Sequence, residues 1–190
     1  GFPVVTIDYS FQKAYSIISD NYGGMKQLTN FILHQGHKKV AFIHGTPSLV
    51  TRNRIDGFAD TMEEAGLKVP AGYLRESRYR SSLLAEEQAM KLLQLPDRPT
   101  CIIAPDDSSA VGVVSAIRKS GLQLVRDISV AGYDGMDLQQ FIGVKLTTVK
   151  QDRETIGREA AKKLLQLIET HNEEVLDTVF IKQSLLIGNS

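Results

Sequence analysis

Short apolar runs alternate along this chain with longer segments in which apolar residues recur every three or four positions. The runs predict buried strands, and the recurring spacing predicts helices with one apolar face. Strands are expected over residues 3–7, 39–43, 72–76, 100–104, 128–131, 145–149 and 178–187. Helices are expected to begin near Asp20 or Asn21, at Arg52, after Arg80, at Ser108 and at Asp152, with a short one over 136–141, whereas 9–19 reads as irregular. Strands that alternate with helices predict an α/β fold, a Rossmann-like parallel sheet flanked by helices.

The segment 99–137 organises the rest of the chain. Its two apolar runs each end in carboxylates, Asp106 and Asp107 after the first and Asp134 after the second. The helix between them, capped by Ser108, makes a βαβ unit, whose two strands run parallel. All three acids are therefore expected at the carboxyl edge of the sheet, where open α/β sheets bind ligands.

Two further side chains are candidates for the same edge. Arg54 lies in the first turn of its expected helix, where the positive helix end disfavours a cation unless something polar or negative faces it. Tyr79 lies in a loop after a strand, where it could stack on a sugar or base ring. A surface arginine and a tyrosine that covers the core are the ordinary alternatives for these two residues.

Composition narrows the possible partners. The chain has 190 residues, 42% of them hydrophobic, enough for one good core or two small lobes. Lys plus Arg and Asp plus Glu are equal at 22 each, so no overall positive field would draw this chain onto nucleic acid. No apolar run reaches the ~18 residues that a membrane-spanning helix needs, so no membrane partner is expected. Cys101 lies in an apolar run and is expected to be packed, not reactive.

Clustered carboxylates allow three chemistries. They could perform acid/base hydrolysis of a glycosidic bond, they could hold Mg²⁺ as phosphotransfer receivers do, or they could accept hydrogen bonds from the hydroxyls of a polyol. The sequence contains no nucleophile elbow, phosphate-binding glycine loop or zinc-ligand spacing. His34 and His37 are three residues apart but have no carboxylate or thiol nearby, so neither a metal nor a cofactor is predicted.

Five motifs follow one another in order: GHKKVAFI at 36–43, RIDGF at 54–58, PTCIIAPDD at 99–107 with Ala110 and Gly112, DISVAGYD at 127–134, and LTTVKQ at 146–151. In this order they closely resemble the LacI/GalR family of bacterial transcription repressors, over nearly the whole chain. Any one of them alone would be a weak signal. The order of all five makes the resemblance specific.

The resemblance implies a periplasmic-binding-protein-like domain, in which two lobes joined by three strands enclose a small-molecule effector. Residues 20–149 look like the complete C-terminal lobe. Residues 1–19 and 150–190 look like the crossing strands and the remainder of an N-terminal lobe that is mostly missing, so the chain is expected to be part of a longer protein. The apolar stripe of the helix after Asp152 would then lie bare.

Function follows from the family in the same way. The resemblance implies a cytoplasmic, non-enzymatic homodimer that senses an effector, a sugar or a related hydroxylated metabolite. Operator DNA would be bound through a helix-turn-helix headpiece that this chain lacks. A sugar-binding protein of a transport system is the nearest alternative, and a carboxylate-based hydrolase or Mg²⁺-dependent receiver is a remote one.

Position by position, the resemblance also assigns ligand-binding roles. Arg54 matches an effector-binding arginine, Tyr79 an aromatic that packs on the ligand ring, and Asp134 an aspartate that accepts ligand hydroxyls. Asp106 stands where the family often has Asn or Asp, and Asp8 and Gln151 match contacts near the hinge. Asp107 is interpreted as a helix-start residue and not as a contact. Two departures from the family pattern are Gly188, where an arginine is usual, and Gly135, where a second acid is frequent.

Overall fold

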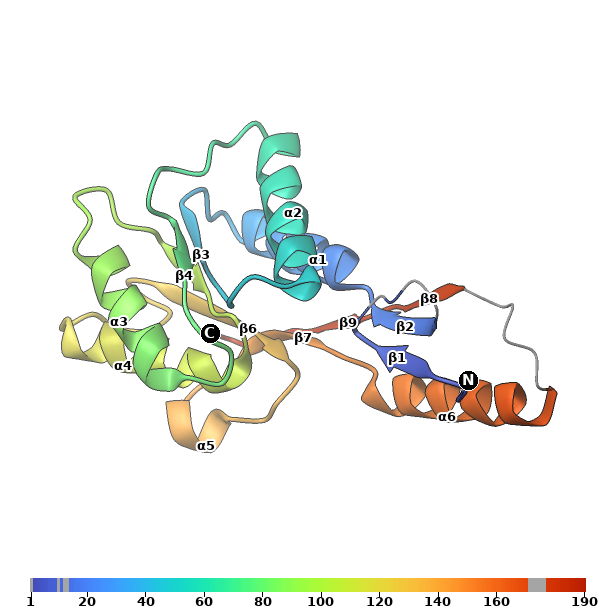
Figure 1. Ribbon diagram of the computed structural model, residues 1–190. Helices are drawn as coiled ribbons and strands as arrows, with labels where there is room; N and C mark the ends of the chain where they lie inside the picture. Colours follow the sequence, from blue (N-terminus) through green and yellow to red (C-terminus); the bar gives the residue numbers. More distant parts are fainter. Residues whose placement is uncertain (1, 10, 12–13, 171–176) are drawn as a thin grey trace.

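The computed structural model describes residues 2–9, 11, 14–170 and 177–190. The strands of this part of the chain form two sheets of unequal size (Figure 1). In this part of the chain the larger sheet has the order β4 (Leu74–Glu76), β3 (Val40–His44), β5 (Cys101–Ile103), β6 (Ser129–Asp134), β7 (Thr147–Lys150), β9 (Ser184–Leu186). The smaller sheet has the order β1 (Val5–Ile7), β2 (Tyr15–Ser19), β8 (Thr178–Ile181). Neighbouring strands are parallel except β7 and β9, which are antiparallel.

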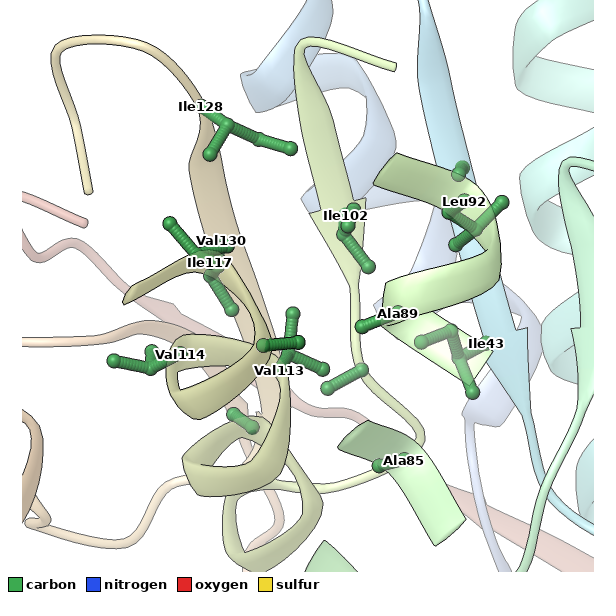
Figure 2. Close-up of a cluster of buried hydrophobic side chains, with 14 of the residues drawn as sticks. Ile43, Ala85, Ala89, Leu92, Ile102, Val113, Val114, Ile117, Ile128 and Val130 are labelled. Carbon is green, nitrogen blue, oxygen red and sulfur yellow. The ribbon is translucent and has the colours of Figure 1, made fainter. Parts of the chain in front are cut away.

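Helices cover both faces of the larger sheet. α1 (Asn21–His34) and α2 (Leu49–Glu64) pack on one face, and α3 (Ser82–Leu93), α4 (Asp107–Lys119) and the short α5 (Gln139–Ile142) lie on the other. Successive strand residues point to opposite faces, so Ile102 joins the core under α3 and α4 while Ile103 joins the core under α1 and α2. Figure 2 shows the first of these cores, with Val113 and Ile117 of α4 against Val130 of β6.

Side-chain caps fix where the helices begin. Asp20 accepts a hydrogen bond from the Gly23 amide (2.8 Å), as expected for the start of α1. α2 begins at Leu49, three residues before the start expected near Arg52, because Ser48 caps it by accepting from the Thr51 amide (3.0 Å). The expected cap at Ser108 is wrong. Asp106 caps α4 through the Ser109 amide (2.8 Å), so Ser108 already lies in the first turn.

The smaller sheet corrects two further expectations. Residues 15–19 form β2, its central strand, and not an irregular segment. The single strand expected over 178–187 is two strands, because β8 belongs to the smaller sheet and β9 to the larger one. The chain crosses between the sheets three times, after β2, after β7 and between β8 and β9 (Figure 1).

The last helix, α6 (Arg153–Thr170), packs on β1 and β2. Asp152 accepts from the Thr155 amide at its start (3.0 Å), which confirms the expected cap. Ile156 is buried, but Leu165 is 60% and Ile168 50% exposed, so much of the apolar stripe lies bare as expected.

Both glycines that depart from the family pattern stand at tight backbone contacts. A Cβ at Gly188 would overlap the carbonyl oxygen of Lys145, and the Gly188 amide donates to Thr147 Oγ1 (3.1 Å). The next amide, of Asn189, donates to the Lys145 carbonyl (2.9 Å), which anchors the segment after β9 without an arginine. Gly135 has φ +73, a backbone conformation that residues with a side chain rarely adopt, and a Cβ there would lie 2.9 Å from the Cα of Lys150.

Candidate functional site

The carboxyl ends of β3, β5 and β6 meet at one edge of the larger sheet, and the first turns of α2 and α4 follow there. α1 begins at the same edge, because its first residue, Asn21, hydrogen-bonds Arg54 of α2. Parallel strands place all these turns together. The polar side chains predicted from separate motifs are thereby brought within reach of one another.

Arg54 lies at the centre of this edge and is 97% buried. Its Nε donates to Asn21 Oδ1 (2.8 Å) and its Nη1 to the carbonyl of Pro105 (2.9 Å). The guanidinium carbon lies 3.5 Å from the ring centroid of Tyr133 and 5.6 Å from that of Tyr79. The sequence pattern predicts Arg54 in the first turn of its helix, where the positive helix end disfavours a cation. Because α2 starts at Leu49, Arg54 lies in the second turn and this unfavourable interaction is avoided.

Tyr79 and Asp106 border the arginine. The Tyr79 hydroxyl is 2.9 Å from Thr51 Oγ1, and its ring covers Gly45, where any side chain would overlap it. Asp106 is buried and accepts from the Ser109 amide through Oδ1 and from the Arg80 amide (2.7 Å) through Oδ2. Both of its oxygens are thus already bonded to backbone donors.

Asp134 and Gln151 form the other side of the edge. Gln151 Nε2 donates to Asp134 Oδ1 (2.6 Å), and the Asp134 side chain is 15% exposed. Burial raises the pKa of Asp134, and the Arg54 guanidinium acts in the opposite direction. Arg153 adds a longer ion pair, with 3.8 Å between Nη2 and Asp134 Oδ2.

Asp8 differs from the other predicted residues. It follows β1 in the smaller sheet and accepts from the amide (2.7 Å) and the hydroxyl (3.2 Å) of Ser19. Its described bonds therefore hold the smaller sheet together and do not connect it to Arg54 or Asp134.

Asp107 starts α4 as expected, but its side chain is fully buried and bonded to other elements. It accepts from the Thr148 hydroxyl (2.7 Å) and from the Met136 amide (2.6 Å). Burial, the largest cause, raises its pKa to about 7 against these two hydrogen bonds. The interpretation of Asp107 as only a helix-start residue is therefore incomplete.

A hollow of about 490 Å³ lies beside Tyr79, between the loop after β3 and the first turns of α2. His44, Ser48, Thr51, Arg52 and Asp56 are among its lining residues, and none of the six predicted ligand-binding residues is. Thr51 belongs to the hollow and also contacts Tyr79, so the two features are adjacent.

Sequence reasoning missed Tyr133, Asn21 and Thr51 as parts of this edge. Tyr133 directly precedes Asp134, but it stands in an apolar strand and reads as core. The sequence pattern suggests Asn21 only as a helix cap. Within the described ranges, no three His, Cys, Asp or Glu residues lie close enough to hold a metal ion.

Comparison with known proteins agrees with this architecture. Residues 29–190 match the periplasmic binding protein-like domain. The chain belongs to this family. A structure of a LacI transcriptional regulator from Bacillus cereus subsp. cytotoxis NVH 391-98 has a TM-score of 0.89 at 30% identity, over 97% of this chain and 66% of that one. The expected fold class is thereby confirmed.

Relatives with this domain are named as transcriptional repressors. The repressor PurR of Glaesserella parasuis serovar 5 (strain SH0165) is 33% identical over 180 residues, 93% of this chain and 53% of the relative. CytR of Escherichia coli (strain K12) is 32% identical over 152 residues, 79% of this chain and 44% of the relative. These matches confirm the resemblance to the LacI family. The chain spans about half the length of the curated relatives it matches.

Two solved structures at 23% identity share the fold of this periplasmic-binding-protein-like domain and have ligands named with them. One is the regulator CelR in complex with cellobiose, with a TM-score of 0.86 over 94% of this chain and 54% of that one. The other is a LacI family regulator from Enterococcus faecium with bound ribose, with a TM-score of 0.85 over 98% of this chain and 69% of that one. Among the described residues, no helix is long and apolar enough to cross a membrane.

Proposed function

We propose that this chain is the effector-sensing domain of a LacI-type transcriptional regulator and that it binds a small hydroxylated metabolite, in the first place a sugar. The observation that carries this proposal is the placement of Arg54 and Asp134 at one sheet edge, each with capacity left for a ligand. Arg54 donates from Nε to Asn21 and from Nη1 to the Pro105 carbonyl, and its Nη2 makes no hydrogen bond to a described residue. Asp134 keeps lone pairs free beside its bond to Gln151.

The six predicted residues take different parts in this proposal. Asp134 accepts ligand hydroxyls, Arg54 donates to a ligand oxygen, and the ring of Tyr79 stacks on the ligand ring. Gln151 orients the Asp134 carboxylate, and Asp106 holds the backbone at Arg80, next to Tyr79. Asp8 completes the site from the smaller sheet when the lobes close.

The larger proposed lobe is residues 20–149. Residues 1–19 and 150–190 supply the crossing strands and the remainder of the other lobe, and β9 among them returns to the larger sheet. A ligand that binds one arrangement of the lobes better than another shifts the population toward it. In a homodimer this shift changes the spacing of helix-turn-helix headpieces outside this chain, and with it the affinity for operator DNA. A coupling of ~1–3 kcal/mol between effector binding and DNA binding is enough for a useful switch. The proposed regulator acts in the cytoplasm, where operator DNA is found.

The comparisons support this proposal over its alternatives. PurR and CytR are named as repressors, which favours a regulator over a transport protein or an enzyme. The cellobiose and ribose named with CelR and the Enterococcus faecium regulator support a sugar as the effector class.

Isothermal titration calorimetry of the chain against D-ribose, cellobiose, other common saccharides and nucleosides tests the function. We expect at least one member of this panel to bind. Binding of none of them would contradict the proposed effector class.

Asp134→Asn then tests the site. A hydrogen bond to a charged group contributes about 1.5–3 kcal/mol, so we expect this variant to weaken binding by about 10- to 150-fold. Its melting temperature should not fall, because the substitution removes a charge that burial already disfavours.

Asp127→Asn is the matched control. Asp127 likewise accepts a hydrogen bond, here from the backbone amide of Gln123 (2.8 Å), but it precedes β6 at the opposite edge of the sheet. The Asp127→Asn variant should bind the effector with the affinity of the parent chain. Equal affinities of both variants would contradict the role of Asp134.

A further inference from the structure

The turn that carries Asp134 has a backbone conformation that requires support. Asp134 has φ +113 and Gly135 follows with φ +73. A positive φ of this size is rare for a residue with a side chain, because it brings the side chain against the backbone. Such a conformation persists only where its surroundings determine it.

Two hydrogen bonds hold the amides that follow Asp134. The Gly135 amide donates to Thr148 Oγ1 (3.3 Å), and the Met136 amide donates to Asp107 Oδ2 (2.6 Å). The Thr148 hydroxyl in turn donates to Asp107 Oδ1 (2.7 Å). Both amides therefore depend on Asp107, one directly and one through Thr148.

Asp107 is itself fixed from three sides. It is fully buried at the start of α4, and its carboxylate lies over Gly132 of β6, where a Cβ would overlap Oδ1. Gly132 pairs with Thr148 across β6 and β7, two residues before Asp134 pairs with Lys150. The sheet register thus places the donor Thr148 beside Gly132, and the glycine leaves room for the Asp107 carboxylate above it.

The same geometry separates Asp107 from the ligand. Asp107 has no exposed surface, whereas the Asp134 side chain reaches solvent. The carboxylates of Asp106 and Asp134 add to the burial that raises the pKa of Asp107 to about 7. Because it has no exposed surface, Asp107 bonds the turn and does not reach a ligand.

We propose that Asp107 is a positioning residue which, together with Thr148, holds the turn at 134–136 so that Asp134 faces the ligand. This inference rests on the proposed function, because the turn matters for binding only if Asp134 contacts the effector. The two hydrogen-bonded amides and the positive φ are properties of the protein without ligand. They can therefore be measured before any effector is known.

Nuclear magnetic resonance of the ligand-free chain supplies the first test. A φ of +113 gives a small coupling between the amide and α protons of Asp134, and relaxation to a negative, extended φ gives a large one. In the parent chain we expect the small coupling, and slow hydrogen exchange at the amides of Gly135 and Met136. A large coupling, or exchange of both amides at the rate of an unstructured peptide, would overturn the proposal without any variant.

Thr148→Val removes the hydroxyl while keeping the volume of the side chain. We expect faster exchange at Gly135, a larger coupling at Asp134 and at least tenfold weaker binding of D-ribose or cellobiose, whichever binds the parent. Thr148→Ser, which restores the hydroxyl, should return all three quantities toward the parent values. A general structural role would lower the melting temperature but leave the Asp134 coupling unchanged well below it.

Thr29→Val is the matched control, because Thr29 is also buried but its hydroxyl has no hydrogen-bond partner among the residues that the structure describes. It should leave exchange, coupling and affinity as in the parent. Unchanged coupling and affinity in Thr148→Val, or equal changes in Thr29→Val, would overturn the proposal. If no saccharide or nucleoside binds the parent chain, the proposed function fails, while the coupling and exchange data still decide whether Asp107 holds the turn.

Discussion

At the scale of single residues, the carboxylates of the sheet edge differ in what their oxygens bond. Asp106 accepts hydrogen bonds from two backbone amides, and Asp107 accepts them from one backbone amide and the buried Thr148 hydroxyl. Asp134 accepts a hydrogen bond from the Gln151 side chain and is partly exposed to solvent. Asp134 differs from the other two carboxylates in having an oxygen outside these hydrogen bonds and a side chain that reaches solvent. Residues of one type and one sheet edge therefore perform different tasks.

Asp107 should make the stability of the chain depend on pH. Its pKa of about 7 in the folded state lies above the ordinary 3.8, so between these values the folded state binds more protons than the unfolded state. The free energy of unfolding should then fall as pH rises, by about 2–3 kcal/mol between pH 5 and pH 8 from this group. Urea denaturation at both pH values measures it.

Asp107→Asn isolates this contribution. The amide cannot titrate, yet it can accept from the Met136 amide and donate to Thr148. In this variant the free energy of unfolding should differ much less between pH 5 and pH 8 than in the parent chain. The remaining difference comes from other titrating groups. The same pH dependence in parent and variant would show that Asp107 is ionised in the folded chain at pH 5.

At the scale of elements, α3 and α4 approach closely because of Gly112. A Cβ at this position would overlap the carbonyl oxygen of Ser82 in the first turn of α3. The glycine therefore sets the distance between the two helices that cover one face of the larger sheet. α4 in turn carries Asp107, so this packing also bears on the site.

Gly112→Ala should lower the free energy of unfolding by about 1–3 kcal/mol, because the helices have to move apart. Gly157→Ala in α6 is the control, since a Cβ there meets nothing within 4 Å. An exposed glycine inside a helix is unfavourable, and the control should stabilise α6 by about 0.5–1 kcal/mol. Urea denaturation followed by circular dichroism compares them, and equal effects would contradict this account of the packing.

At the scale of the whole molecule, the core is concentrated in the larger sheet. Both clusters of buried apolar residues involve its strands and α1 to α5. The buried residues Ile17 and Ile18 of the smaller sheet and Ile156 of α6 lie outside both clusters. The smaller sheet and α6 also leave Phe180 and Leu165 60% exposed. Few apolar contacts predict low local stability.

Hydrogen exchange followed by mass spectrometry should therefore show two levels of protection. Peptides from β1, β2, β8 and α6 should exchange at least tenfold faster than peptides from β3, β5 and β6, because they open without unfolding of the larger sheet. Equal protection of both groups would mean that the chain unfolds as a single cooperative unit.

The sequence by itself determined most of the elements in their order, most of the strands of the larger sheet and the edge at which Asp106 and Asp134 lie, and it left Arg54 and Tyr79 as candidates for that edge. These follow from local patterns and from the handedness of βαβ units, which act over short stretches of chain. The motif order also determined the family, which the comparisons confirm.

Only the tertiary structure decided which oxygen bonds which donor. That Asp107 accepts from Thr148 and Met136, that Tyr133 stacks on Arg54, and that residues 178–187 divide between two sheets depend on contacts between residues far apart in the sequence. Burial and hydrogen-bond partners at such distances are set by sheet register and helix packing. The motif that contains a carboxylate therefore predicts at which edge of the sheet it lies, whereas the donors that surround it in the folded chain decide which hydrogen bonds it accepts.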